Sequence, residues 1–375
     1  MSELDRLIAE LCPYGVEYRA LGECCRLSAG GDVPKESFSK EQTDEYNVPI
    51  YSNGIGDNAL YGWTNKAKII ESCVTIAARG TIGYSELREK PFVPIIRLIC
   101  AIPNDDVDVK YLKYSVETIS FQVPTSGIPQ LTVPMASKYK IPLPPLPVQR
   151  GIVRILDNFT ELIAELTAEL EARKKQYEYY SGELLANCKE HAQSVELGSV
   201  VDMKAGKFIQ AVEISQVQDA EYRYPCYGGN GLRGYVKSYN HDGEYLLIGR
   251  QGALCGNVKR ANVKFYATEH AVVVDTGATV NVDWLFHMLT RMNLNQYASK
   301  SAQPGLAVGN IAKLEISLPP LVQQERIADI LDRFDTLTTD MSNGLPAEIE
   351  ARRKQYEYYR DKLLRFEGAK AIASV

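Results

Sequence analysis

The sequence lacks the patterns of a membrane protein and of the common metal or redox sites. No run in its 375 residues approaches the roughly 18 consecutive apolar residues of a membrane span. Its first residues, MSELDRLIAELCPYG, have no basic start followed by an apolar core, so we expect no secretory signal. No CxxC pair occurs among the eight cysteines. We therefore expect a cytoplasmic protein whose cysteines are reduced core residues.

Catalytic motifs are also missing. The four histidines show no HxxxH spacing, and their only acidic neighbours are Asp242 and Glu269. The stretches GGNG and GRQGALCGN fit neither GxxxxGK[ST] nor a GxGxxG that opens a helix. The two Pro-Pro pairs are flanked by leucine, unlike the Asn/Asp-Pro-Pro-aromatic motif of amino-methyltransferases. The sequence thus predicts no metal site, no bound cofactor and no active site.

Composition indicates a protein with more than one folded domain. At 45% hydrophobic and 24% charged residues, a chain of this length can bury two or three cores. The formal net charge of -5 gives no overall attraction to polyanions. Any nucleic-acid role must therefore depend on local basic patches.

The chain repeats itself. EARKKQYEYY at 171–180 returns as EARRKQYEYY at 350–359, and SGIPQLTVPMASKYKIPLPPL at 126–146 aligns without gaps with SAQPGLAVGNIAKLEISLPPL at 301–321. Upstream likenesses are weaker but occur in the same order, with VPIYSNGIG resembling YPCYGGNGLRG and IAARGTIGY resembling LIGRQGALCGN. The sequence thus predicts two similar halves, each a divergent globular part followed by a nearly identical helical part.

The helical parts have coiled-coil periodicity. From Ile152, apolar residues recur in steps of four and three, Pro147 suits the first turn, and roughly 40 residues give a helix of about 60 Å. The repeat offset grows from 175 residues at Pro144 and Pro319 to 179 at Arg173 and Arg352. We therefore expect SNGLPAE, at 342–348, to break or kink the second helix. The expected seam and subunit-docking residues are Leu156, Phe159, Ile163, Leu166, Leu170, Tyr177, Leu331, Phe334, Tyr356 and Tyr359.

Arg173 and Arg352 hold equivalent positions in this seam. Two explanations stay open: a buried polar pair that fixes register, or side chains that reach out to solvent at the edge of the seam.

The globular parts are predicted to be mixed α/β domains. The runs SCVTIAA, PIIRLICAI, EYLLIGR and HAVVV indicate strands, whereas VDVKYLKYSVE and VDWLFHMLTRM indicate short helices. Loops that carry Gly together with Tyr, Asn, Arg and Gln are suited to base edges, although Gly and Asn also serve simply as turn formers. The candidate DNA-binding residues are Tyr51, Ser52, Asn53, Arg79, Thr81, Lys204, Lys207, Tyr227, Asn230, Arg233, Arg250 and Gln251.

The whole chain resembles the specificity subunit of type I restriction-modification enzymes. The resemblance is carried by two copies of LPPL-x-x-Q-x-x-I, with Gln149 and Ile152 in the first and Gln324 and Ile327 in the second. It implies an α+β fold in which two target-recognition domains are separated by two long helices that pair as an antiparallel coiled coil, in a pseudo-twofold, circular tandem repeat. The implied parts are an N-terminal helical tail (1–15), recognition domains at 16–142 and 195–317, and helical spacer regions at 143–194 and 318–375.

The resemblance also implies function and partners. A noncatalytic subunit of this kind reads a bipartite target in double-stranded DNA, and docks two modification (methyltransferase) subunits and the restriction (motor-nuclease) subunits. S-adenosylmethionine, ATP and magnesium are then expected on those partners only. The alternative is a tandem-domain interaction scaffold that binds peptide or carbohydrate, which the acidic balance would suit. An enzyme with an unrecognised site is a third reading.

Two structural expectations follow. Arg79 and Arg250, in equivalent "ARG" and "GRQG" turns, are predicted to face DNA. The N-terminal stretch 4–23 resembles the junction at 182–199, so the N-terminus is predicted to close against the C-terminal helix, with Leu7 and Leu11 near Leu363 and Phe366.

Overall fold

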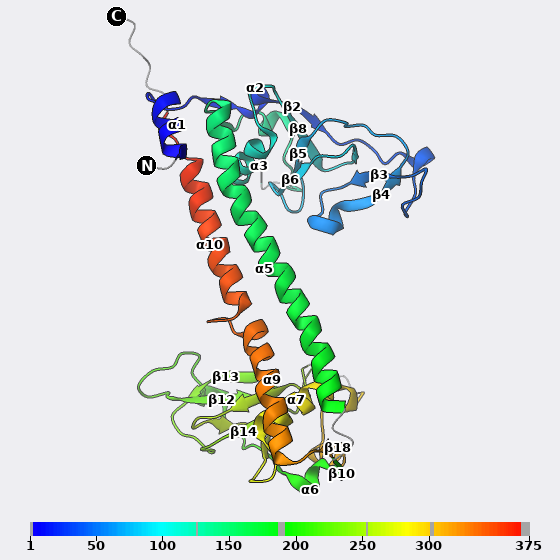
Figure 1. Cartoon of the computed structure of the whole chain (residues 1–375), viewed down its shortest axis with the longest axis vertical. Coiled ribbons are helices and arrows are strands. Elements are labelled where there is room, and N and C mark those ends of the chain that lie inside the picture. The colour runs from blue at the N-terminus through cyan, green and yellow to red at the C-terminus, as the bar shows by residue number, and fades with distance from the viewer. Residues whose placement is uncertain (1–2, 125–126, 187–191, 253, 301–303, 369–375) are drawn as a thin grey trace, which may run out of the picture. The chain divides into compact units, whose positions relative to one another are not determined.

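A computed structural model describes residues 3–124, 127–186, 192–252, 254–300 and 304–368. Ser126 and Ser301, which the repeat aligns, and residues 187–191 of the junction lie outside these ranges. The chain forms two compact units, residues 1–165 with 349–375 and residues 166–348. Each unit contains one mixed α/β domain and parts of the long helices (Figure 1). No described helix is long and apolar enough to cross a membrane.

The first unit contains a domain of small sheets. A four-stranded sheet has the order β2-β8-β5-β6, a three-stranded sheet the order β4-β3-β7, and β1 pairs with β9. The strands are β1 (Tyr18–Ala20), β2 (Cys25–Ala29), β3 (Val48–Tyr51), β4 (Leu60–Thr64), β5 (Cys73–Ala77), β6 (Ser85–Arg88), β7 (Val93–Pro94), β8 (Leu98–Pro103) and β9 (Lys140–Pro142). The helices outside the long rod are α1 (Glu3–Leu11), α2 (Leu21–Cys24), α3 (Val109–Glu117) and α4 (Val133–Ala136), with short 3-10 turns at Lys35–Ser37 and Gly56–Ala59.

The second unit repeats this topology strand for strand. Its sheets have the orders β11-β17-β14-β15, β13-β12-β16 and β10-β18. The strands are β10 (Gln193–Glu196), β11 (Asp202–Ala205), β12 (Tyr224–Gly228), β13 (Gly231–Val236), β14 (Tyr245–Gly249), β15 (Val258–Ala261), β16 (Tyr266–Ala267), β17 (Ala271–Asp275) and β18 (Glu315–Leu318). The shorter helices are α6 (Leu197–Val200), α7 (Val282–Arg291) and α8 (Val308–Ala312), with 3-10 turns at Ala211–Glu213 and Leu294–Tyr297.

The predicted strands and helices are confirmed where their hydrophobic pattern was strongest. The runs SCVTIAA and EYLLIGR contain β5 and β14, HAVVV contains all of β17 except Asp275, and the two predicted short helices are α3 and α7. Every residue of β5 is buried, which explains why that strand reads as a continuous apolar run. The run PIIRLICAI is only partly one strand, because Arg97 adopts a left-handed φ of 80° and the long strand β8 begins at Leu98.

The long helices pair antiparallel. Helix α5 (Leu146–Ala186) has Pro147 in its first turn, as predicted, and α9 (Leu321–Thr339) and α10 (Leu345–Leu363) together form its partner. In the first unit Phe159 of α5 stacks on Tyr359 of α10, with ring centroids 5.4 Å apart. In the second unit Tyr180 of α5 stacks on Phe334 of α9 at 5.8 Å. Within the first unit Leu156 shares a cluster with Leu363 and Leu364, so residue numbers rise along α5 as they fall along α10, and the two helices are antiparallel.

The predicted break in the second long helix is confirmed. Helix α9 ends at Thr339, and α10 starts at Leu345. Gly344 lies between them, and an added Cβ there would come within 2.7 Å of the carbonyl oxygens of Thr336 and Asp340. Only glycine fits this close crossing of backbone.

The N-terminus closes against the C-terminal helix within the first unit. Leu4 and Leu364 are buried in one apolar cluster, and Leu7 packs against it together with Leu363 and Phe366. Val16 N donates to Glu367 O at 2.9 Å. The predicted circular closure is therefore confirmed for Leu7. It is wrong for Leu11, which is 38% exposed because α1 ends there.

Candidate DNA-binding loops

The loop after β5 is fixed by backbone hydrogen bonds. Ala78 N donates to Arg97 O at 2.8 Å, and Ala78 O accepts from Leu131 N at 2.9 Å. Gly80 then turns the chain with a left-handed φ of 69°. The backbone of this loop is therefore fixed, and it sets the positions of the loop's side chains.

The loop after β14 uses the same bonds. Arg250 N donates to His270 O at 2.8 Å, and Arg250 O accepts from Leu306 N at 2.9 Å. Gly252 follows with a left-handed φ of 90°. Each partner here is the counterpart of the first-domain partner in the repeat, since Leu131 and Leu306 align in the sequence.

These bonds show which positions of the two turns correspond. Ala78 and Arg250 hold the same place, and the following residues, Arg79 and Gln251, form the next pair. The two turns are therefore equivalent, as predicted, and the two arginines lie one position apart within them.

The first-domain loop side chains are tied to one another. Arg79 donates through Nε (3.0 Å) and Nη2 (2.6 Å) to Gln130 Oε1. Asn53 Nδ2 donates to Arg79 O at 2.8 Å, and Thr81 Oγ1 donates to Asn53 O at 3.2 Å. The structure thus brings three predicted residues of this domain together, and it orients the half-buried Arg79 through Gln130.

The second-domain loop side chains line one hollow. Asn230, Arg233 and Gln251 are exposed there, around a space of about 310 Å³. Arg250 lies beside it and donates from Nη1 to Glu269 O at 3.5 Å. Three of the predicted residues of this domain therefore converge on one site.

The remaining predicted residues lie in other settings. Tyr51 is half-buried, with the Arg88 guanidinium 3.8 Å from its ring centroid, and Tyr227 is half-buried against Phe265. Both tyrosines therefore take part in packing. The other three are polar: Ser52 Oγ donates to Ala59 O at 3.4 Å, Lys204 pairs with Asp202, and Lys207 is exposed.

Sequence reasoning missed Arg97 and His270. Each lies just before a strand, β8 or β17, and its carbonyl oxygen accepts a hydrogen bond from the loop of its domain. Arg97 is also one of the few described non-glycine residues with positive φ. Such strained backbone is concentrated at functional sites. His270 lines the second-domain hollow, with Nε2 3.1 Å from Glu269 Oε1. In the sequence His270 counted only as one of four histidines without HxxxH spacing.

A buried polar contact fastens the second domain to its helices. His287 of α7 is 0% exposed, with Nε2 2.9 Å from Asp332 Oδ1 of α9 and Nδ1 2.9 Å from Tyr177 OH of α5. Burial lowers the pKa of His287 below its ordinary value despite this carboxylate. The neutral ring can then donate to Asp332 and accept from Tyr177. Burial likewise raises the pKa of Tyr177 to about 12, so its hydroxyl stays protonated.

The first domain is fastened by a different set of side chains. Tyr114 OH donates to Asp157 Oδ1 at 2.7 Å, and Tyr356 OH donates to Glu117 Oε2 at 2.9 Å. Seam residues Leu156 and Leu331 are fully buried in the clusters that include these domain contacts. The predicted seam residues near the start of each helix thus pack against an α/β domain as well as against a helix.

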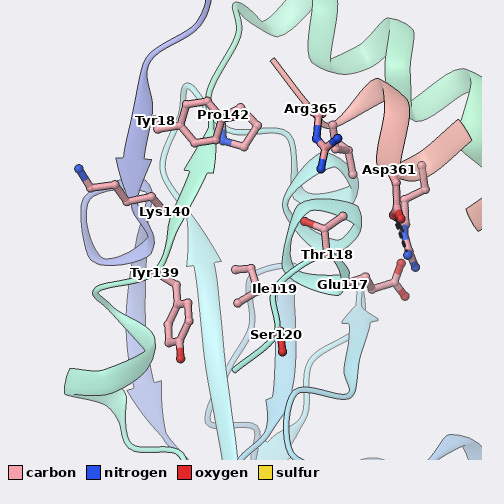
Figure 2. A pocket seen from close by; sticks show the side chains of 12 residues that line it. Tyr18, Glu117, Thr118, Ile119, Ser120, Tyr139, Lys140, Pro142, Asp361 and Arg365 are labelled. Atoms are coloured by element: carbon pink, nitrogen blue, oxygen red, sulfur yellow. Dashed lines mark hydrogen bonds and ion pairs between the residues drawn. The ribbon is translucent and has the colours of Figure 1, made fainter. Parts of the chain in front are cut away.

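The first unit also has a hollow where α10 ends (Figure 2). It measures about 500 Å³ and lies among β1, β9, the end of α3 and Asp361 and Arg365. In the second unit Arg291 Nη2 lies 3.1 Å from where a Cβ of Gly182, the counterpart of Asp361 in the repeat, would be. The two helix ends therefore differ where QYEYYSGELL and QYEYYRDKLL diverge.

Comparisons with known proteins agree on one family. The family description "Type I restriction modification DNA specificity domain" matches residues 13–172 and 189–351. The EcoprrI specificity subunit of Escherichia coli is 46% identical over 293 residues, covering 72% of this chain and 73% of that protein. The EcoR124I/EcoR124II specificity subunit of Escherichia coli is 28% identical over the full length of both chains.

Solved structures share the fold. The crystal structure of a type I restriction-modification S subunit from M. genitalium has a TM-score of 0.67 at 16% identity, covering 93% of this chain and 96% of that chain. A structure from a study of assembly and conformational transition in the type I system has a TM-score of 0.55 at 15% identity, covering 94% and 98%.

Proposed function

Because the chain belongs to the type I restriction-modification DNA specificity family, we propose that it reads a bipartite DNA target, one half-site with each α/β domain, and catalyses nothing itself. The main support is that both domains have the same strand order but different side chains at equivalent loop positions. Arg79 is matched by Gln251, Asn53 by Gly229, and Arg97 by His270. A common scaffold with different loop chemistry suits two half-sites of different sequence.

Docking of modification subunits is the second part of the proposal. The repeated EYY stretches expose Tyr179 and Tyr358 at 63% and 62%, on equivalent turns of α5 and α10. Exposed tyrosines at matching places suit two copies of one partner, since tyrosine is enriched at the energetic centres of interfaces. S-adenosylmethionine, ATP and magnesium then belong to the partners, and the reaction takes place there.

Methylation mapping tests the DNA reading. Methylome sequencing of cells with and without this chain is expected to give one bipartite motif that depends on it. Exchange of the loop 228–233 should change one half of the motif only. The competing scaffold that binds peptide or carbohydrate gives no such motif, and a pulldown from the native cytoplasm then recovers no methyltransferase.

A further inference from the structure

The second domain has a hollow with a glycine wall. It is lined by Gly228–Arg233, Gln251, Gly252 and His270 and measures about 310 Å³. Gly231 and Gly252 have φ values of 87° and 90°, and no atom lies within 4 Å of where a Cβ of Gly252 would be. A Cβ on Gly229 would come within 2.7 Å of Gln251 O. Bare backbone therefore forms much of the wall, and a flat group can approach it closely.

Three hydrogen-bonding side chains surround this wall. Asn230, Arg233 and Gln251 are exposed, and their side chains make no hydrogen bond or ion pair with the described residues. His270 adds a ring whose Nδ1 is buried and also lacks a partner within the described part of the chain. The three exposed side chains can exchange water for a ligand, whereas the buried His270 Nδ1 is costly to leave without a hydrogen bond.

We propose that this hollow reads one purine base of the second half-site through its major-groove edge, an inference that rests on the proposed function. Arginine pairs bidentately with guanine O6 and N7, and asparagine and glutamine pair bidentately with adenine N6 and N7. All three side chains around the hollow thus belong to the types that select purines. The nearby Lys259, whose Cε lies 3.7 Å from the Cβ position of Gly231, supplies charge for a flanking phosphate.

Among the described residues, the side chains of the corresponding loop in the first domain are hydrogen-bonded to one another. Arg79, the counterpart of Gln251, donates two hydrogen bonds, from Nε and Nη2, to Gln130 Oε1. Asn53 Nδ2 donates to Arg79 O. Changes in the hollow of the second domain should therefore leave the first half-site unaltered.

Two variants of the full chain, assembled with its methyltransferase partner, test the assignment. Gly228→Ala adds a methyl group to the wall, and its Cβ meets Arg233 Cδ and Thr268 Oγ1 at an ordinary 3.6 Å, so the fold is kept. Gln251→Ala removes an exposed amide. Gln296→Ala, whose amide donates to Met292 O, and Gly309→Ala, which has open space around it, are the matched controls.

The readouts are the methylated motif and the affinity for a duplex carrying it. We expect both test variants to lose about tenfold or more in affinity, and to relax or change one purine position of one half-site, while both controls behave as wild type. An unchanged motif and affinity in both test variants overturns the purine site. An equal loss of affinity on all DNA sequences indicates a phosphate contact, and it overturns the purine site as well. If the wild-type chain directs no bipartite methylation, the proposed function itself fails.

Discussion

Gln149 and Gln324 make matching hydrogen bonds in the two halves of the chain. Gln149 Oε1 accepts from Asp108 N at 2.8 Å, and its Nε2 donates to Pro144 O at 2.8 Å. Gln324 Oε1 accepts from Asn281 N at 2.7 Å, and its Nε2 donates to Pro319 O at 2.8 Å. Each glutamine ties the start of its long helix to the N-cap of the neighbouring domain helix, which explains why LPPL-x-x-Q occurs twice.

Replacing Gln324 with leucine should therefore destabilise the second unit. The side chain is 1% exposed, so its loss leaves Asn281 N without its acceptor inside the protein. We expect a loss of about 1 to 3 kcal/mol in the free energy of unfolding, measured by urea denaturation. Gln323→Leu on the exposed face of the same helix is the control and should cost little. Equal stability of both variants would rule out a structural role for the motif glutamine.

Charge removal at Arg79 or Arg250 should weaken DNA binding by the assembled methyltransferase. Arg79 is oriented by Gln130 and Arg250 by Glu269 O, so each guanidinium is held at a loop beside its domain's other candidate residues. Alanine at either position should weaken the binding free energy by about 1 to 3 kcal/mol if the arginine contacts a base. If it contacts a phosphate, alanine should reduce the slope of log affinity against log salt concentration by about 1. Titration of a target duplex at several salt concentrations separates the two. Full affinity in both variants contradicts the prediction.

The sequence predicts the fold better than it predicts the loop contacts. Strand β5 and helix α7 follow from local hydrophobic pattern, and the helix break before Leu345 follows from the repeat offset. The capture of Arg79 by Gln130 joins residues 51 positions apart, so no local pattern announces it. The left-handed φ of Arg97 also depends on the packed loop. The equivalence of Arg79 with Gln251 was therefore visible only once the backbone bonds were known.

The His287 contact should make the second unit sensitive to acid. Its folded pKa lies below the ordinary 6.5, so the unfolded chain takes up a proton first as pH falls. The stability that neutral His287 contributes is therefore fully present above about pH 6.5, and it is lost as pH falls through the folded pKa. Asp332, Asp335, Arg260 and Tyr177 face this ring, and Arg260 opposes its protonation.

Urea unfolding between pH 7.5 and 5 measures this effect. His287→Gln removes the titrating group, so its stability should fall less over this range than that of the wild type. Tyr114→Phe in the first unit removes a hydrogen bond to Asp157 without removing a group that titrates there, and should keep the wild-type slope. Identical slopes for His287→Gln and wild type would show that other groups cause the acid sensitivity.

An insertion in α5 tests whether the helix sets the length of the DNA spacer. Thr-Ala-Glu-Leu at 167–170 resembles Ile-Ala-Glu-Leu at 163–166 and lies inside the continuous helix, so a second copy after Leu170 adds helix without a breaker. Four residues add about 6 Å and about 40° beyond a full turn. One base pair of B-DNA advances about 3.4 Å and about 35°. The rotation thus matches one base pair, whereas the length alone suggests nearly two.

The rotation, and not the added length, should set the new spacer. A side chain that is turned to the wrong face of a groove cannot reach its base through a small change in length. We therefore expect the insertion variant to keep both half-sites and to lengthen the preferred spacer by one base pair, with two as the weaker outcome. The two partner helices, α9 and α10, are separated between Thr339 and Leu345, so their backbone can adjust there to a longer α5. Methylome sequencing of the variant measures the spacer directly. An unchanged spacer with full activity means that the helix only docks partners, and altered half-sites mean that residues 16–142 and 195–317 are not the reading domains.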